Sequence, residues 1–415
     1  MTLSQQVTDF VNQTEQEIKS HLEETDKIAE FNQLKVLQAM QQSRLSDIHF
    51  AATTGYGYND LGRDKLEEIY ATVFRAEAAL VRPQLVSGTH ALAVALFGNL
   101  RPGDTLLYLT GAPYDTLHQV IGIQPAVGSL AEYGVNYRQV GFDYSKIEEA
   151  FSKQKIKMAA IQRSKGYAWR PSFTIDEIEK LIAFVKKISP DTICMVDNCY
   201  GEFVEQREPI EAGADMAVGS LIKNPGGGLA PVGGYIVGGL TYIEAAASRL
   251  TAPGIGMEVG PTLGLTSALM QGFFLAPQVV GGSLYGAILA AAVFEKLGFE
   301  TLPNSKDARA DIVQAIKMGN SDSVLSFCRG IQAAAPVDSF VTPEAAYVPG
   351  YTNPVVMAAG AFVQGSSIEL SADAPLAEPY IVYLQGGLTR YHAKIGVMYA
   401  LQSLVDEGLE MICHV

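Results

Sequence analysis

The chain has 415 residues, more than one ordinary core, which predicts two domains, and its 48% hydrophobic and 18% charged residues indicate a well-packed protein. Its 30 lysines and arginines stand against 44 acidic residues, so the net charge is −14. This balance, without any basic cluster, argues against a nucleic-acid partner and against binding to anionic membranes. The four cysteines and six histidines lack metal-ligand spacing, so we expect no metal site. The N-terminus lacks the features of a signal peptide, and we expect a cytoplasmic protein.

Residues 1–60 are the first predicted unit, a polar N-terminal helical arm. In its first part apolar residues recur at helical spacing, at Val7, Phe10, Val11, Ile18 and Leu22. We expect this arm to pack on a neighbouring subunit rather than to carry chemistry.

Residues 61–282 are the predicted large domain, in which helix-like and strand-like runs alternate. A helix is expected at 174–188. The strand candidates are apolar or β-branched runs at 105–109, 135–140, 157–162, 192–197, 216–222 and 234–237. This alternation predicts an α/β domain with a doubly wound, mostly parallel sheet and helices on both of its faces.

Four motifs that could carry chemistry follow one another along this domain. Ser87-Gly88-Thr89-His90 opens a helix-like run, where free N–H groups would attract an anion. Tyr114 lies in a turn after a strand candidate, and Asp197 ends another, at the sheet edge where α/β proteins bind ligands. The motif Ser220-Leu221-Ile222-Lys223 precedes a triple glycine. A desolvated lysine there loses its proton easily and becomes a nucleophile able to form a Schiff base.

The run 259–294 carries no charge and is rich in Gly, Ala, Leu and Phe, a composition that a hydropathy scan would score as a membrane span. Pro261, Pro277 and the pair Gly281-Gly282 interrupt it. We therefore expect separate helices, buried between the two domains and against a partner subunit.

Residues 283–415 are the predicted small domain. A helix-like run at 284–297 leads to strand candidates at 299–302, 355–363, 366–370 and 380–384, and a final helix pattern covers 394–405. This texture predicts an α+β domain, with the active site in the cleft between the two domains.

The order of the motifs resembles fold-type I enzymes that depend on pyridoxal 5′-phosphate (PLP), in the cysteine and methionine branch of methionine γ-lyase and cystathionine lyases. The similarity is closer to the aluminium-resistance, or methionine γ-lyase-like, proteins. It rests on the segments 55–58 with Gly62-Arg63, 113–117, 162–167 and 385–389, and it runs from about Gly55 to the C-terminus. The resemblance implies a PLP-dependent transferase-like fold with a seven-stranded sheet in the large domain.

The resemblance also implies roles for the four motifs. Lys223 would hold PLP covalently and then remove the substrate Cα proton, and Asp197 would keep the pyridine nitrogen protonated. Tyr114 would stack on the ring and could protonate a leaving thiol. Backbone amides and hydroxyls would hold the phosphate, from Gly88, Thr89, Ser87 and Ser220.

Two further sets of residues are implied by the resemblance. One set matches a segment that reaches the phosphate of a neighbouring subunit: Tyr56, Tyr58 and Arg63. It implies a dimer of shared active sites, and the family suggests a tetramer. Either tyrosine could fill the role, since the family's tyrosine–arginine spacing is absent. A bidentate arginine should bind the substrate carboxylate. Its candidates are Arg390, by position, and the rivals Arg163 and Arg170.

The predicted activity is that of a PLP-dependent carbon–sulfur lyase. It would act by α,γ- or α,β-elimination on a small sulfur amino acid such as methionine, homocysteine, cystathionine or cysteine. Two alternatives remain: another fold-type I activity, aminotransferase or aldolase-like, and a non-catalytic PLP-binding stress protein linked to aluminium resistance. No carboxylate or Cys/His cluster suited to a hard cation supports the second, and no Gly-x-Gly-x-x-Gly motif supports a dehydrogenase.

Overall fold

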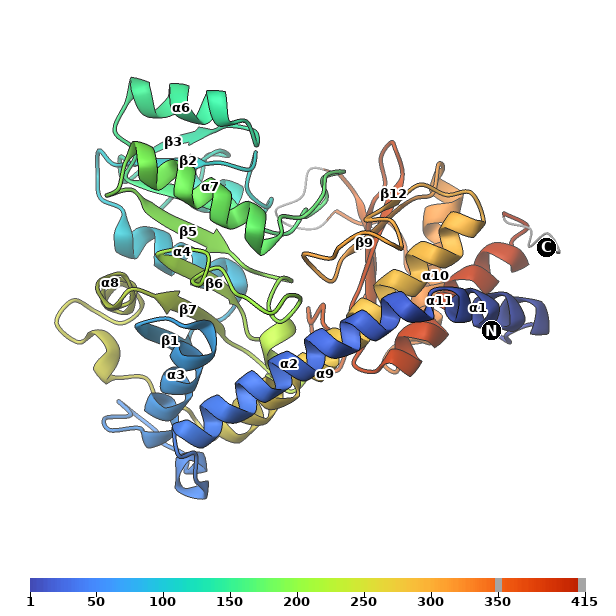
Figure 1. Cartoon of the computed structure of the whole chain (residues 1–415), viewed down its shortest axis with the longest axis horizontal. Coiled ribbons are helices and arrows are strands. Elements are labelled where there is room, and N and C mark those ends of the chain that lie inside the picture. The colour runs from blue at the N-terminus through green and yellow to red at the C-terminus, as the bar shows by residue number, and fades with distance from the viewer. Residues whose placement is uncertain (348–352, 410–415) are drawn as a thin grey trace.

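The computed structural model describes residues 1–347 and 353–409. The chain forms a large and a small unit, and one long helix runs along both (Figure 1). The large unit is built on a seven-stranded sheet and the small unit on a five-stranded sheet.

The large sheet has the strand order β1-β7-β6-β5-β4-β2-β3. Its strands are β1 (Ala78–Arg82), β2 (Thr105–Tyr108), β3 (Asn136–Gln139), β4 (Met158–Gln162), β5 (Ile193–Asp197), β6 (Met216–Ser220) and β7 (Gly234–Gly238). Only β7 runs against its neighbours; the remaining pairs are parallel. The prediction of a mostly parallel seven-stranded α/β sheet is therefore confirmed, and all six strand candidates are present. Strand β1 was not predicted, because its two alanines and terminal arginine give little β signal.

Helices cover both faces of this sheet, because alternate residues of the buried strands point to opposite sides. The helices of the large unit are α3 (Leu61–Phe74), α4 (Gly88–Asn99), α5 (Leu117–Ile121), α6 (Tyr144–Lys153), α7 (Ile175–Ile188) and α8 (Leu240–Leu250). Leu106 of β2 packs with the core under α4 and α8, whereas its neighbour Leu107 packs with the core under α7. The predicted helix at 174–188 is confirmed, and Thr174 caps it by accepting a hydrogen bond from the Glu177 amide.

The long helix α9 (Thr266–Lys296) contains most of the uncharged run. Its length and composition would let it cross a membrane, but 83% of its most apolar window is buried inside the protein. Burial is therefore confirmed. The prediction of separate helices was wrong, since α9 continues through Pro277 and the pair Gly281-Gly282. Proline removes one backbone hydrogen bond, and packing of α9 against its neighbours outweighs that loss.

The small unit contains an antiparallel sheet of order β10-β11-β12-β9-β8 and two helices of its own. Its elements are β8 (Thr301–Leu302), β9 (Gln314–Lys317), α10 (Ser321–Ala334), β10 (Val355–Ala358), β11 (Ser371–Pro375), β12 (Ile381–Gln385) and α11 (Arg390–Asp406). The strand predicted at 366–370 was wrong. That segment forms a loop, and the Glu369 carboxylate accepts hydrogen bonds from the amides of Phe362 and Val363.

The N-terminal arm packs on its own chain. Helix α1 (Gln5–Glu17) places Val7 and Val11 in the core of the small unit, and α2 (Lys19–Gln42) lies along α9 (Figure 1). The predicted domain boundary at residue 282 falls inside α9, whose first half contributes to the core of the large unit and its second half to that of the small unit.

Candidate active site

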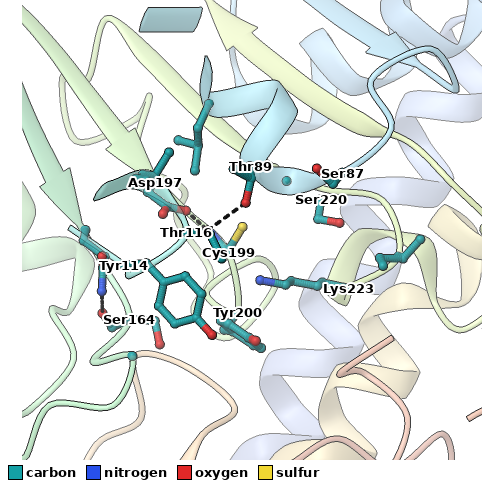
Figure 2. Close-up of a pocket in the computed structure, with 16 residues that line it drawn as sticks. Ser87, Thr89, Tyr114, Thr116, Ser164, Asp197, Cys199, Tyr200, Ser220 and Lys223 are labelled. Carbon is teal, nitrogen blue, oxygen red and sulfur yellow. Dashed lines mark hydrogen bonds between the residues drawn. The ribbon is translucent and has the colours of Figure 1, made fainter. Parts of the chain in front are cut away.

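A cavity of about 190 Å³ opens at the carboxyl ends of β4, β5 and β6 (Figure 2). Gln162, Asp197 and Ser220 are the last residues of these three strands, and all three line the cavity. Parallel strands bring such residues to one edge of the sheet. The cavity gathers seven of the predicted cofactor residues: Ser87, Gly88, Thr89, Tyr114, Asp197, Ser220 and Lys223.

Asp197 is a buried carboxylate at the floor of this cavity. Only 7% of its surface is exposed, and its Oδ1 accepts a hydrogen bond from the Cys199 amide at 3.2 Å. Burial raises the pKa of Asp197, although the charge of Lys223 and hydrogen bonds from Cys199 act in the opposite direction. A buried carboxylate of this kind is stabilised by a cationic N–H donor, which is what a protonated pyridine ring presents.

Lys223 points into the cavity from the turn after β6, where the short helix η2 (Asn224–Gly226) begins (Figure 2). Its Nζ lies 3.9 Å from the centroid of the Tyr200 ring. The prediction that burial makes this amine lose its proton easily was wrong for the chain without cofactor. Burial opposes the charge, but Cys199, Tyr200 and Asp197 outweigh it and raise the pKa of Lys223. A ligand that pairs with Asp197 would weaken this effect and favour the neutral, nucleophilic amine.

The opposite side of the cavity is suited to an anion. Helix α4 begins at Gly88, and the Ser87 hydroxyl caps it by accepting from the His90 amide at 3.1 Å. The Ser220 hydroxyl is buried and has no hydrogen-bond partner within the described residues. A Cβ on Gly88 would lie only 3.2 Å from the Ser220 Cβ. An anion seated between the helix start and Ser220 would meet free amides and satisfy this hydroxyl.

Nine further residues line the cavity, and the sequence analysis gave none of them a role in the site. They are Leu92, Thr116, Leu117, Gln162, Ser164, Gly166, Cys199, Tyr200 and Ile222. Thr116 pairs with Thr89 through their hydroxyls at 2.8 Å, and Gln162 keeps a buried side-chain oxygen without a partner within the described residues. A signal existed for some of them, because Cys199 and Tyr200 follow Asp197 by two and three positions.

The three candidate arginines lie outside the lining of this cavity. Arg163 is fully buried beneath the turn after β5, where it donates to Asn198 and to the carbonyl of Gly201. Arg170 donates to the backbone carbonyls of Pro171, Gln162 and Ser164. Arg390 is half exposed on α11 and lies 3.7 Å from Asp26 of α2. These positions do not favour a role in binding the substrate carboxylate within the same chain.

The segment predicted to reach a neighbouring subunit also lies outside the cavity of its own chain. Tyr56 and Tyr58 are exposed, and their rings stack with centroids 5.4 Å apart. Arg63 is buried and donates to the Gly57 carbonyl at 2.8 Å, so it holds the turn between the two tyrosines. The tyrosines are thus available on the surface, whereas Arg63 serves their loop.

The donor set of the cavity fits PLP. The unpartnered Ser220 hydroxyl and the start of α4 suit its phosphate, Asp197 suits its ring nitrogen, and Lys223 suits its aldehyde. Within residues 1–347 and 353–409, no group of three or more His, Cys, Asp or Glu side chains could hold a metal ion.

Residues 7–405 match the family model described as methionine gamma-lyase. The chain belongs to the methionine γ-lyase family. Over 405 residues it is 50% identical to the uncharacterized protein YnbB of Bacillus subtilis (strain 168), and the match covers 96% of each chain. It is also 50% identical to a solved structure named a carbon-sulfur lyase involved in aluminum resistance from Clostridium novyi NT, with a TM-score of 0.93 and coverage of 97% and 96%.

A more distant structure shows the same fold. The pyridoxal-5′-phosphate-dependent protein YhfS of Escherichia coli is 17% identical, with a TM-score of 0.63 and coverage of 91% of this chain and 96% of the other. The predicted relationship to methionine γ-lyase-like and aluminium-resistance proteins is therefore confirmed, as is the fold-type I PLP-enzyme fold.

Proposed function

We propose that this member of the methionine γ-lyase family is a PLP-dependent carbon–sulfur lyase that acts on a small sulfur amino acid. The observation that carries the proposal is the shared cavity of Lys223 and Asp197, which the start of α4 and Ser220 also line. Family membership and the carbon–sulfur lyase name of the relative from Clostridium novyi support the same reaction class.

Each residue of the cavity has a task in such a reaction. When bound, PLP supplies an electron sink for the carbanion that forms at the substrate Cα. Lys223 would hold PLP through Nζ, and the same amine would take the proton from the substrate Cα. The Asp197 carboxylate holds a proton on the pyridine nitrogen. The Tyr114 phenol would give its proton to the departing sulfur, and with one water molecule consumed the products would be a thiol, ammonia and a 2-oxo acid.

The exposed tyrosines extend the proposal to a second copy of the chain. Tyr56 and Tyr58 lie on the surface and outside their own cavity, so we assign one of them to the phosphate of a neighbouring subunit. A dimer of shared active sites is then the minimal unit. We propose that the protein forms a tetramer and that it is cytoplasmic. The variants Tyr56→Ala and Tyr58→Ala should identify the tyrosine that reaches the phosphate. Only the loss of that tyrosine should weaken PLP binding, and sedimentation should show that the oligomer is intact in both variants.

Absorbance and product analysis test the function. The purified chain should show the band of lysine-bound PLP above 400 nm, roughly the range expected of such a chromophore. Borohydride reduction should fix the cofactor on Lys223, as read by peptide mass spectrometry. Lys223→Ala should abolish both signals, whereas Lys180→Ala, at an exposed position on α7, should keep both.

A substrate panel then separates the reaction classes. Methionine, homocysteine, cystathionine and cysteine are offered one at a time, and thiol and 2-oxo acid are measured together. Their equimolar release supports the lyase. A 2-oxo acid without thiol would point instead to aminotransfer, and no turnover of any amino acid by PLP-loaded protein would leave a binding role. Calorimetry with Al³⁺ tests the stress-protein alternative directly, and an absence of heat would dispose of it.

A further inference from the structure

Tyr200 occupies an unusual backbone conformation beside the reactive lysine. It lines the cavity three residues after Asp197, and its ring centroid lies 3.9 Å from the Lys223 Nζ. Its φ is 73°, in the left-handed region that bulky side chains rarely adopt. Such a conformation costs about 1 kcal/mol or more and persists only where the surrounding structure imposes it.

Arg163 contacts the turn that contains Tyr200 on both sides of this residue. Its guanidinium is fully buried and donates to the Asn198 side chain at 2.8 Å and to the Gly201 carbonyl at 2.9 Å, on either side of Tyr200. A Cβ on Gly201 would lie 2.5 Å from the Arg163 Cδ, so the turn and the arginine are in direct contact. Glu205 balances the charge of Arg163 at 2.8 Å. The turn is therefore held at both ends by one side chain.

We propose that Tyr200 is a positioning residue for Lys223: its ring face holds the ε-ammonium group inside the cavity whenever that group is not bonded to the cofactor. Arg163 keeps Tyr200 in the backbone conformation that this contact requires. Figure 2 shows the Lys223 amine directed toward Tyr200. The inference rests on the proposed function, in which Lys223 alternates between a bonded and a released state. In the released state, a contact is needed that keeps its amine inside the cavity.

The ring is one of several groups that act on Lys223. Asp197, Cys199 and Glu202 face the amine from the turn after β5, and Asp373 of β11 acts on it from the small unit. These groups remain when the ring is removed. The pKa of Lys223 should therefore fall only by the amount that the ring contributes. A cation–π contact of this kind corresponds to a shift of about 0.4–1.5 pH units in the titration of the amine.

The titration of Lys223 in the full chain freed of cofactor tests the proposal without any assay of activity. Trace acetylation with acetic anhydride, over a pH series extended upward until the reaction of Lys223 levels off and followed by peptide mass spectrometry, gives the midpoint at which Lys223 becomes nucleophilic. Tyr200→Phe keeps the ring and removes the phenol, whose charge also acts on Lys223, so it is the reference for the contribution of the ring. Tyr200→Leu should titrate about 0.4–1.5 units below Tyr200→Phe. The midpoint is compared rather than the rate, because removal of the ring also widens access.

Three controls make the result decisive. Tyr200→Gly removes the ring but suits a positive φ, so it gives the same comparison if the leucine variant does not fold. Tyr133→Leu removes an exposed tyrosine elsewhere and should change nothing. Gly201→Ala displaces Arg163 and should lower the midpoint with Tyr200 intact. A midpoint equal to that of Tyr200→Phe in both ring-deleted variants overturns the proposal for Tyr200, and an unchanged midpoint in Gly201→Ala overturns the part played by Arg163. PLP binding is measured separately, so a failure of the proposed function is distinguished from a failure of this inference.

Discussion

Gln162 and Asp197 lie opposite each other as the last paired residues of the parallel strands β4 and β5. The pairing places an amide and a carboxylate side by side at the sheet edge, and both line the cavity. The Gln162 side-chain oxygen and the Asp197 carboxylate therefore face the same ligand space. Two consecutive strands supply the floor of the site.

Asp197→Asn keeps the shape of this floor and removes its charge. We expect PLP to remain bound, because Lys223 and the anion-binding side are unchanged. Turnover should fall by about 100-fold or more, since a neutral amide does not hold a proton on the ring nitrogen. Steady-state release of 2-oxo acid measures the loss, with the absorbance of bound PLP as the control for occupancy. A variant with nearly full turnover would contradict the role of Asp197.

Ser220→Ala should have opposite effects on ligand binding and on stability. The Ser220 hydroxyl is buried without a partner in the described part of the chain, so its removal should leave the melting temperature of the cofactor-free protein unchanged or higher. PLP should bind about 10-fold to 100-fold more weakly, because a hydrogen bond to a charged phosphate contributes roughly 1.5–3 kcal/mol. Fluorescence titration with PLP and thermal melting measure the two effects. Unchanged affinity would remove Ser220 from the phosphate site.

Glu202 should make the stability of the protein depend on pH. Burial raises the pKa of Glu202 to about 8, so the folded chain keeps a proton that the unfolded chain releases above its ordinary pKa. The folded state binds more protons between these values, and the free energy of unfolding therefore falls as pH rises toward 8. Glu202→Gln lacks this titration. From pH 6 to pH 8, the difference in free energy of unfolding between the variant and the wild type should therefore shift in favour of the variant by about 2–3 kcal/mol.

Urea unfolding at several pH values measures this difference. The Tyr235 hydroxyl donates to Glu202 at 2.8 Å, and a glutamine oxygen can accept the same bond. Glu148→Gln, at an exposed position on α6, serves as the matched control and should follow the wild type at every pH. Parallel curves for the wild type and Glu202→Gln would show that Glu202 is already ionised in the folded chain.

Asp311 lies just before β9 and binds the loop that follows β4, which contains Ser164 and Lys165. Its carboxylate accepts from the Ser164 hydroxyl at 2.6 Å and from Lys165 Nζ at 3.1 Å, and both charged side chains are buried. Asp311→Ala should lower the free energy of unfolding by about 3–5 kcal/mol, because it leaves a buried ammonium group unpaired. The double variant Lys165→Met/Asp311→Leu should recover most of this loss. Urea unfolding measures both, and equal losses in the two variants would contradict the ion-pair explanation.

The sequence predicted the floor of the site well, because local patterns encode it. An apolar run that ends in Asp197, and another that leads through Ser220 to Lys223, place their polar residues at one sheet edge as soon as the strands are parallel. Helix α4 was foreseen for the same reason, since Ser87 and Gly88 mark its start. These features depend on residues adjacent in the chain.

The structural features that the sequence did not predict depend on contacts between segments that are distant in the chain. The ring of Tyr200 faces Lys223 only because Arg163, far back in the chain, fixes the turn between them. Arg390 was a candidate for the substrate carboxylate by its position in the sequence, and α11 directs it toward Asp26 of α2. Pro277 resembled a helix end, but burial on several sides keeps α9 continuous. In each case tertiary packing overrides the local signal.

The placement of α1 also affects how the protein is made. Val7 and Val11 are synthesised before other side chains of the same core, which include Ile288 of α9 and Leu401 of α11. At translation speeds of about 5–20 residues per second, these apolar side chains wait for tens of seconds before their partners emerge. The core of the small unit therefore forms only after α11 has been synthesised, and until then the apolar side chains of α1 lack these partners.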